Sequence, residues 1–220
     1  MDHAALDYAV DALEEARSQI VAGRHAGLRD VFAVPALAAL AENPEFRRLA
    51  SALLEREAFV VRALFFDKNA EANWKVAWHQ DLTICVRERM DAAGFGPWSM
   101  KEGVPHVQPP VEILERMVTL RLHLDDCDQS NGALRVLPGS HLGGKLSAAA
   151  IENWRRGTPE RVCATARGEV LAMRPLLLHA SSATSEPRHR RVLHLDFAGE
   201  ELPGGLRWRT MAGQSVAVHS

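Results

Sequence analysis

The chain has 220 residues, of which 47% are hydrophobic and 25% charged, with a formal net charge of −2 and a pI near 6.6. This length fits a single domain. The near-neutral charge argues against a general nucleic-acid binder, which would normally be basic. No apolar run approaches the roughly 18 residues that a membrane span needs, so we expect neither nucleic acid nor membrane as a partner.

The cysteines and the N-terminal sequence bear on the compartment. Cys85, Cys127 and Cys163 are odd in number and widely spaced, and none forms a CxxC pair. A zinc knuckle or a disulfide framework is therefore not expected. The first 19 residues are acidic and amphipathic, which is not typical of a signal peptide. We expect a protein of the reducing cytoplasm.

Residues 1–57 are predicted to be mostly helical and to pack on the part that follows. Apolar residues recur with helical spacing from Leu6 to Ile20, and Gly23 is placed to end that helix. A second helix is predicted to begin at Asn43-Pro44, a capping residue followed by proline at the first helical position. The predicted apolar face of this helix consists of Phe46, Leu49, Ala50, Leu53 and Leu54.

Residues 58–200 have the character of a β-domain. Short β-branched or leucine-rich segments alternate with turn signals: FVVRALFF, LTICV, MVTLRLHL, ALRVL, EVLAMRPLLLH and RRVLHLDFA. Many short strands joined by irregular loops predict a mainly β fold, a sandwich or barrel of jelly-roll type, with flanking helices. The connection over residues 88–110 is rich in glycine and proline, and a loop of that length is often a lid or a substrate loop.

A histidine and an aspartate one residue apart, His79 and Asp81, lie in the segment WHQDLTICV. On a strand, side chains two residues apart lie on the same face, so both could reach one metal ion while Gln80 points away. Two ligands make a weak site, and the spacing by itself is not specific. The same spacing recurs at His123/Asp125 and at His194/Asp196.

A third ligand is available further along the chain. His179 ends an apolar segment, Ser181 follows two residues later, and Arg190 lies eleven residues after His179. Two histidines and one carboxylate form the facial triad that leaves open positions on Fe(II). A bidentate co-substrate with a second carboxylate would need a fixed cation, for which the planar fork of arginine is suited.

These residues, together with the segment NGALRVLPGSH, resemble the phytanoyl-CoA dioxygenase-like family of Fe(II)/2-oxoglutarate oxygenases over roughly residues 58–200. The resemblance implies a double-stranded β-helix with helices packed outside. It also implies that His79, Asp81 and His179 bind iron. Arg190 and Ser181 would hold the far carboxylate of 2-oxoglutarate.

The activity implied by the resemblance is hydroxylation of an unactivated C–H bond of a small, carboxylate-bearing or acyl substrate, with dioxygen consumed and succinate and CO2 released. Halogenating relatives lack the carboxylate ligand, so the presence of Asp81 favours hydroxylation. Desaturation and ring closure remain open, as do a monomer and a homodimer. One alternative is a cupin-type isomerase or simple dioxygenase that uses no 2-oxoglutarate and has no need of Ser181 and Arg190. Another is a silent binding module, which an intact triad disfavours.

The segment VTLRLHLDD departs from the family pattern, because related members usually carry tryptophan at the position of Arg121. Strand alternation would place Thr119, Arg121 and His123 on one face. The leucines of the segment would then pack outward against another layer: Leu120, Leu122 and Leu124.

Two roles are open for Arg121 and two for His123. A buried guanidinium is costly unless it is paired with an anion. Arg121 is therefore expected either to bind a carboxylate of 2-oxoglutarate or of the substrate, or to form a salt bridge. The possible salt-bridge partners are Asp125, Asp126 and Asp196. His123 is expected either to touch the substrate or to be satisfied by polar neighbours.

The other polar and aromatic residues are assigned mainly structural roles. His194 and Asp196 are expected to be satisfied by neighbours. His141 is expected to hydrogen-bond locally, and His189 to face the side of its strand opposite Arg190. Trp98 is the exception, because its loop could close over the iron, and the Trp98 side chain would then contact the substrate. His3, His25 and His219 are expected on the surface.

Overall fold

The computed structural model describes residues 7–8, 10–12, 27–28, 31, 34–69, 73–184 and 188–209. Most of the predicted first helix lies outside the described residues, as do His3, His25 and His219. The described helices are α2 (Pro35–Ala41), α3 (Pro44–Leu54), α4 (Val111–Glu115) and α5 (Ala148–Gly157), with a 3-10 helix at Ser140–Gly143. None of them combines the length and the apolar character that crossing a bilayer requires.

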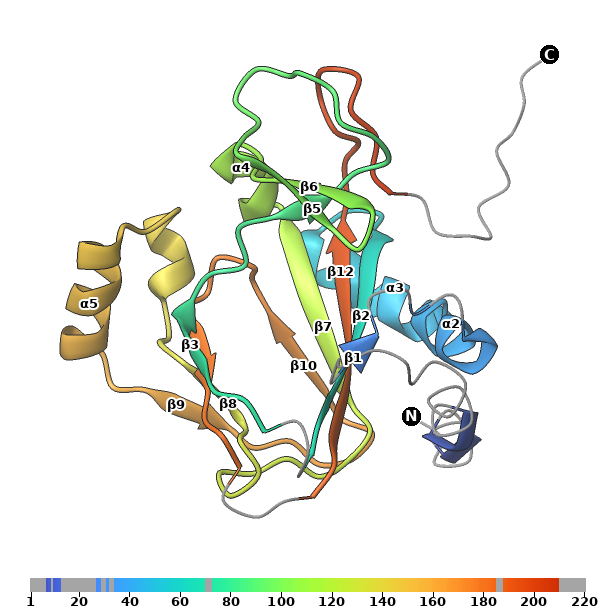
Figure 1. The fold of residues 1–220 in the computed structure, drawn as a ribbon, viewed down its shortest axis with the longest axis vertical. Coiled ribbons are helices and arrows are strands. Elements are labelled where there is room, and N and C mark those ends of the chain that lie inside the picture. The colour runs from blue at the N-terminus through green and yellow to red at the C-terminus, as the bar shows by residue number, and fades with distance from the viewer. Residues whose placement is uncertain are drawn as a thin grey trace.

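Three antiparallel sheets make up the rest of the described fold (Figure 1). The five-stranded sheet has the order β1 (Gly27–Leu28), β2 (Phe59–Lys68), β12 (Arg190–Ala198), β7 (Met117–His123) and β10 (Val170–Met173). The four-stranded sheet has the order β3 (Val76–His79), β11 (His179–Ser181), β8 (Leu134–Val136) and β9 (Arg161–Cys163). The third has the order β4 (Ile84–Cys85), β6 (Val104–Val107) and β5 (Trp98–Lys101).

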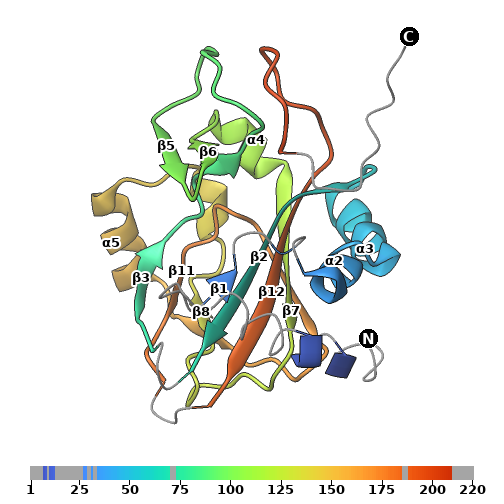
Figure 2. The ribbon, with the colours of Figure 1, turned by 45° about the vertical axis from the view of Figure 1, so that its right-hand side comes forward.

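The two larger sheets face each other, and this arrangement confirms the predicted double-stranded β-helix with flanking helices (Figure 2). Helices α2 and α3 cover the outer face of the five-stranded sheet, where the predicted leucines pack. The main hydrophobic cluster there includes Phe46 and Ala50 from α3 and Leu120, Leu122 and Leu124 from β7. Because both faces of β7 are covered, all of its residues are buried.

Helix α3 begins where predicted, but its buried face is narrower. The Asn43 side chain accepts a hydrogen bond of 2.9 Å from the backbone N–H of Glu45, and Pro44 occupies the first turn. Leu49 and Leu53, both predicted to pack inward, are each 39% exposed. The buried residues of the helix are Phe46, Ala50 and Leu54, which recur every four residues and so form one narrow stripe.

The long connection over residues 88–110 is not structureless. It contains the hairpin β5–β6, whose strand β6 pairs with β4 through Ile84 and Val107. This third sheet lies at one end of the barrel, at the top of Figure 1. Trp98 is half-buried there and packs against a hydrophobic cluster that includes Val107. The guanidinium of Arg89 lies 5.6 Å from the centre of the Trp98 ring.

Candidate metal centre

His79, Asp81 and His179 converge on one point of the four-stranded sheet. Strands β3 and β11 are paired so that His79 lies directly opposite His179, with 4.1 Å between the ring centres. Strand β3 ends at His79, so Asp81 lies just beyond it and not on the strand as predicted. Its backbone N–H donates to the carbonyl of Pro175. One ligand atom from each side chain lies within 4.8 Å of the other two.

The hydrogen bonds of the two imidazoles leave one nitrogen of each ring available to a metal. His79 Nδ1 bonds the carbonyl of Ala77 at 2.9 Å, and His179 Nδ1 bonds that of Leu177 at 2.8 Å. A carbonyl can only accept, so Nδ1 carries the proton and Nε2 holds a free lone pair. The Nε2 atoms lie 3.9 Å and 3.7 Å from the oxygens of Asp81.

The protonation states also suit metal binding. Oδ2 of Asp81 is buried without a hydrogen-bond partner among the described residues, and such an orphaned acceptor calls for an explanation. Burial raises the pKa of Asp81, but His179, His194 and Arg62 together hold it below its usual range. Burial lowers the pKa of His179 to about 4, against the opposing effect of Asp81. A carboxylate and neutral imidazoles are the ligand forms that Fe(II) takes.

A chain of buried polar groups crosses the inner face of the opposite sheet. Arg62 donates to Asp196 at 2.5 Å, and Thr119 donates to the same carboxylate at 2.7 Å. His194 Nε2 lies 3.1 Å from Asp196, and Arg121 donates to His194 Nδ1 at 2.9 Å. Burial raises the pKa of Asp196, but Arg62 and His194 hold it well below its usual range. His194 and Asp196 are thus satisfied by neighbours, as predicted.

Loss of the Asp196 carboxylate should destabilise the protein strongly. The Asp196→Ala substitution would leave Arg62 buried without a counter-ion and is expected to lower the free energy of unfolding by about 3–5 kcal/mol, measured by urea denaturation. The control is Glu152→Ala, which removes an exposed i,i+3 ion pair with Arg155 and should cost less than about 1 kcal/mol. Equal losses of unfolding free energy in the two variants would contradict a structural role for Asp196 and its hydrogen-bond partners.

Two buried cations meet at the other end of the same sheet face. Arg190 pairs in register with Lys68 of β2, and the two are 4% and 0% exposed. Arg190 Nη1 donates to the carbonyl of Gly132 at 2.5 Å. Lys68 Nζ donates to the carbonyl of Ser182 at 2.6 Å and lies 3.4 Å from Ser181 Oγ. Within the described ranges, no carboxylate pairs with either cation.

Lys68 belongs to this group but was not predicted from the sequence. The available signal was a lysine at the end of a largely apolar strand segment, FVVRALFFDK, which also carries Arg62 and Asp67. The glycine of the NGALRVLPGSH segment also has a physical explanation. Gly132 has a φ of 78°, and a Cβ there would lie 2.6 Å from the carbonyl oxygen of Ser182. Only glycine lets the two backbones approach this closely.

The structure does not show the salt bridges considered for Arg121. Asp125 pairs with Arg191 at 2.6 Å, and Asp196 is occupied by Arg62. Asp126 accepts from the backbone N–H of Arg167. Among the described residues, no ion pair involves Arg121. His123 is 1% exposed and neither ring nitrogen has a hydrogen-bond partner, so it is not satisfied by polar neighbours.

Two further histidines can be compared with their predictions. His189 Nδ1 lies 2.9 Å from Asp67 Oδ1, whereas the guanidinium of Arg190 bonds Gly132. The two side chains therefore have separate partners. The predicted local hydrogen bond of His141 is not found at Nδ1, which is buried and has no partner within the described part of the chain. The hydroxyl of Ser140 makes the turn contact instead, donating 2.7 Å to the carbonyl of Leu137.

Several solved structures share this fold over most of the chain. AviO1 from Streptomyces viridochromogenes Tue57 is 19% identical to this chain, with a TM-score of 0.63. The match covers 91% of this chain and 86% of the AviO1 chain. The carbocyclase SnoK from nogalamycin biosynthesis, described as non-heme and alpha-ketoglutarate-dependent, is 14% identical, with coverages of 98% and 81% and a TM-score of 0.69. EctD from S. alaskensis, solved with 2-oxoglutarate and 5-hydroxyectoine, is 16% identical, with coverages of 90% and 69% and a TM-score of 0.68.

At these identities the likeness establishes the fold alone. No curated protein sequence matches the chain. The family model for phytanoyl-CoA dioxygenase (PhyH) matches residues 4–192, which extends the resemblance into the N-terminal part of the chain. The chain therefore belongs to the phytanoyl-CoA dioxygenase family, a family of iron- and 2-oxoglutarate-dependent oxygenases.

Proposed function

We propose that this protein is an Fe(II)/2-oxoglutarate-dependent dioxygenase that hydroxylates an unactivated C–H bond of a small, carboxylate-bearing or acyl substrate. The observation that carries the proposal is the pairing of two features on facing sheets. One is the His-Asp-His group, in which His179 is buried and His79 and Asp81 are half-buried, with ligand atoms within 4.8 Å of one another. The other is a buried pair of cations, Lys68 and Arg190, without a carboxylate partner among the described residues.

In this proposal His79, Asp81 and His179 hold the iron. When bound, Fe(II) would supply the oxygen chemistry, coupled to oxidation of 2-oxoglutarate to succinate and CO2. The backbone carbonyls of Ala77 and Leu177 hold each ring in the tautomer that presents Nε2. Two imidazoles and one carboxylate would hold the ion and would leave further coordination positions to small molecules.

Arg190, Lys68 and Ser181 would hold the far carboxylate of 2-oxoglutarate. Among the described residues, the one oxygen that the Arg190 guanidinium hydrogen-bonds is the carbonyl of Gly132, and its Nε has no partner there. The ammonium has a carbonyl and a hydroxyl. A carboxylate placed between them would satisfy both cations and exchange its water shell for fixed donors. The Ser181 hydroxyl adds a further donor from the strand that carries His179.

The presence of Asp81 supports hydroxylation, because this ligand occupies the position that a halide would need. Ring closure and epimerisation are the competing outcomes, since SnoK is described as a carbocyclase and SnoN as an epimerase. The product distinguishes them. Hydroxylation adds one oxygen atom to the substrate, ring closure removes two hydrogen atoms, and epimerisation leaves the mass unchanged.

The test has two stages. Anaerobic addition of 2-oxoglutarate to the Fe(II)-loaded protein should produce a visible charge-transfer band, and admission of air should then release succinate. A metabolite extract incubated with the enzyme should contain a compound that gains one oxygen, with the label taken from 18O2. Absence of both the band and succinate would contradict the proposed function. A cupin-type enzyme that needs no 2-oxoglutarate would give this negative result.

The affinity for 2-oxoglutarate should fall above pH 8. Burial and the positive charge of Arg190 lower the pKa of Lys68 to about 8. Below that pH the ammonium is already charged, whereas above it the protein must take up a proton to bind the carboxylate. The Kd of 2-oxoglutarate for the Ni(II)-loaded protein should therefore rise from pH 8 to 9.5, approaching about tenfold per pH unit.

Calorimetry on the Lys68→Met variant should show that it binds 2-oxoglutarate more weakly than the wild type. Its Kd should also change less between pH 8 and 9.5. Lys75→Met, the same change at an exposed lysine, should keep the wild-type profile. Because the metal is the same in every titration, its own pH dependence cancels from the comparison. Parallel profiles for the wild type and Lys68→Met would show that Lys68 does not contact the co-substrate.

A further inference from the structure

We infer that Arg121 and His123 form a second anion site on β7, which binds a carboxylate of the substrate in the presence of 2-oxoglutarate. This inference rests on the proposed function and narrows it, because it identifies the substrate as an acid whose anionic end enters the barrel.

Arg121 is a buried cation with an incomplete set of partners. Its side chain is 7% exposed. Nη1 donates to His194 Nδ1 at 2.9 Å, and Nε has no partner among the described residues. Burial and Arg190 lower the pKa of Arg121 to about 10, so the guanidinium stays charged at neutral pH. A buried charge in this state is stabilised by an anion that it can bind.

His123 lies two residues further along the same face of β7 and is also unsatisfied. It is 1% exposed, and neither ring nitrogen has a hydrogen-bond partner within the described part of the chain. Burial and the charges of Arg121 and Arg190 lower its pKa to about 3, so the ring is neutral and has one N–H to donate. An arginine and a donating imidazole side by side can both bond one carboxylate.

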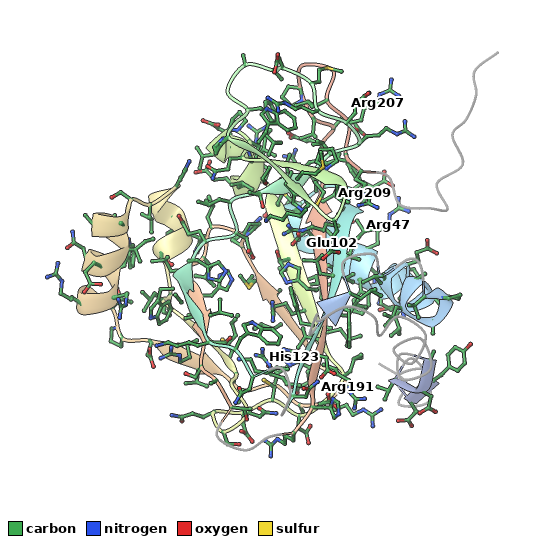
Figure 3. The ribbon with its side chains drawn as sticks, in the orientation of Figure 1. Arg47, Glu102, His123, Arg191, Arg207 and Arg209 are labelled. Carbon is green, nitrogen blue, oxygen red and sulfur yellow. The ribbon has the colours of Figure 1, made fainter. Side chains whose placement is uncertain are left out.

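The strand register places Arg121 and His123 between Asp196 with its partners on one side and the Lys68–Arg190 pair on the other. Arg121 is opposite His194 and His123 is opposite Val192 on β12, while Arg190 at the end of the same strand is opposite Lys68. The charges of both Arg190 and Asp81 act on Arg121. In Figure 3, His123 lies among the strands of the barrel, whereas Arg207 and Arg209 lie near its far end.

The charge balance favours the substrate over 2-oxoglutarate as the source of this carboxylate. Fe(II) and Arg190 together would balance Asp81 and the two carboxylates of 2-oxoglutarate. Arg62 balances Asp196. Arg121 then remains as an unbalanced buried charge, and protonated Lys68 adds another. Binding a substrate with one negative charge at Arg121 would reduce this excess, whereas a neutral substrate would leave it.

The test uses 19F NMR with two small probes of similar size, trifluoroacetate and the neutral 2,2,2-trifluoroacetamide. Both are titrated into protein saturated with Ni(II) and 2-oxoglutarate, so that the Arg190 site is already filled. The wild type should bind the anion at least about tenfold more tightly than the amide. Arg121→Gln should lose this preference, Arg121→Lys should retain part of it, and His123→Ala should weaken anion binding about three- to tenfold.

The affinity for 2-oxoglutarate, measured on the same samples, separates the possible results. Arg121→Gln should change it less than threefold. If Arg121→Gln weakens 2-oxoglutarate as much as Arg190→Gln does, or if anion binding survives Arg121→Gln, the proposal is overturned. Equal binding of acid and amide by the wild type also overturns it. Thermal melts and the Arg121→Lys variant show whether a loss reflects misfolding.

Failure of the proposed function would look different. The wild type would then bind no 2-oxoglutarate, while trifluoroacetate binding to the metal-free protein could still be measured and would still depend on Arg121. The metal-free titration is therefore run in parallel, with Arg190→Gln included so that probe bound at Arg190 is subtracted.

Discussion

Replacement of His179 by alanine should abolish iron binding and 2-oxoglutarate turnover. His179 is 5% exposed, and its Nε2 lies 3.7 Å from Asp81, so no other described side chain is placed to take over its position. Loss of groups that merely support metal ligands costs about 10–100-fold in affinity, so loss of the ligand itself should cost more than about 100-fold. Iron retained after anaerobic desalting, together with succinate release, measures the effect.

The matched control is His189→Ala. His189 has a 44% exposed side chain and contacts Asp67 outside the triad, so this variant should bind iron and release succinate as the wild type does. A His179→Ala protein that keeps a full equivalent of iron would show that the metal lies elsewhere. Circular dichroism should show that both variants are folded, because truncation of His179 removes one hydrogen bond among the described residues, to the carbonyl of Leu177.

The second large effect is expected from Arg190→Gln, which should retain iron and lose 2-oxoglutarate. Glutamine keeps a polar group near the Gly132 carbonyl but removes the charge that we propose binds the co-substrate. A carboxylate left in a buried site with one cation fewer is destabilised by several kcal/mol, so the Kd of 2-oxoglutarate should rise on the order of 100-fold. Anaerobic titration of the charge-transfer band measures this constant directly.

Arg188→Gln is the control for that measurement. Arg188 has a 43% exposed side chain and pairs with Asp128 on the surface, so its Kd for 2-oxoglutarate should stay within about twofold of the wild type, as expected for a surface ion pair. If the Arg190→Gln variant bound 2-oxoglutarate as tightly as the wild type, the Lys68–Arg190 pair would have another role. His179→Ala and Arg190→Gln therefore separate the metal site from the co-substrate site.

Much of the fold and of the metal site was predictable from local sequence. The strand segments from FVVRALFF to RRVLHLDFA lie where strands form, because β-branched and leucine-rich runs between turn signals suit a sheet buried on both faces. The alternation of leucine and polar residues over 119–124 also correctly assigned the two faces of β7. His79, Asp81 and His179 converge in the structure as the resemblance implied.

Only the tertiary structure decided which polar groups remain without a partner. The sequence determined that Arg121 and His123 share a face, because alternation along one strand is a local property. It could not determine that Asp125 pairs with Arg191 and Asp196 with Arg62, since those pairings depend on register between distant strands. For the same reason Lys68 joined Arg190 only in the folded sheet, where β2 and β12 bring their ends together.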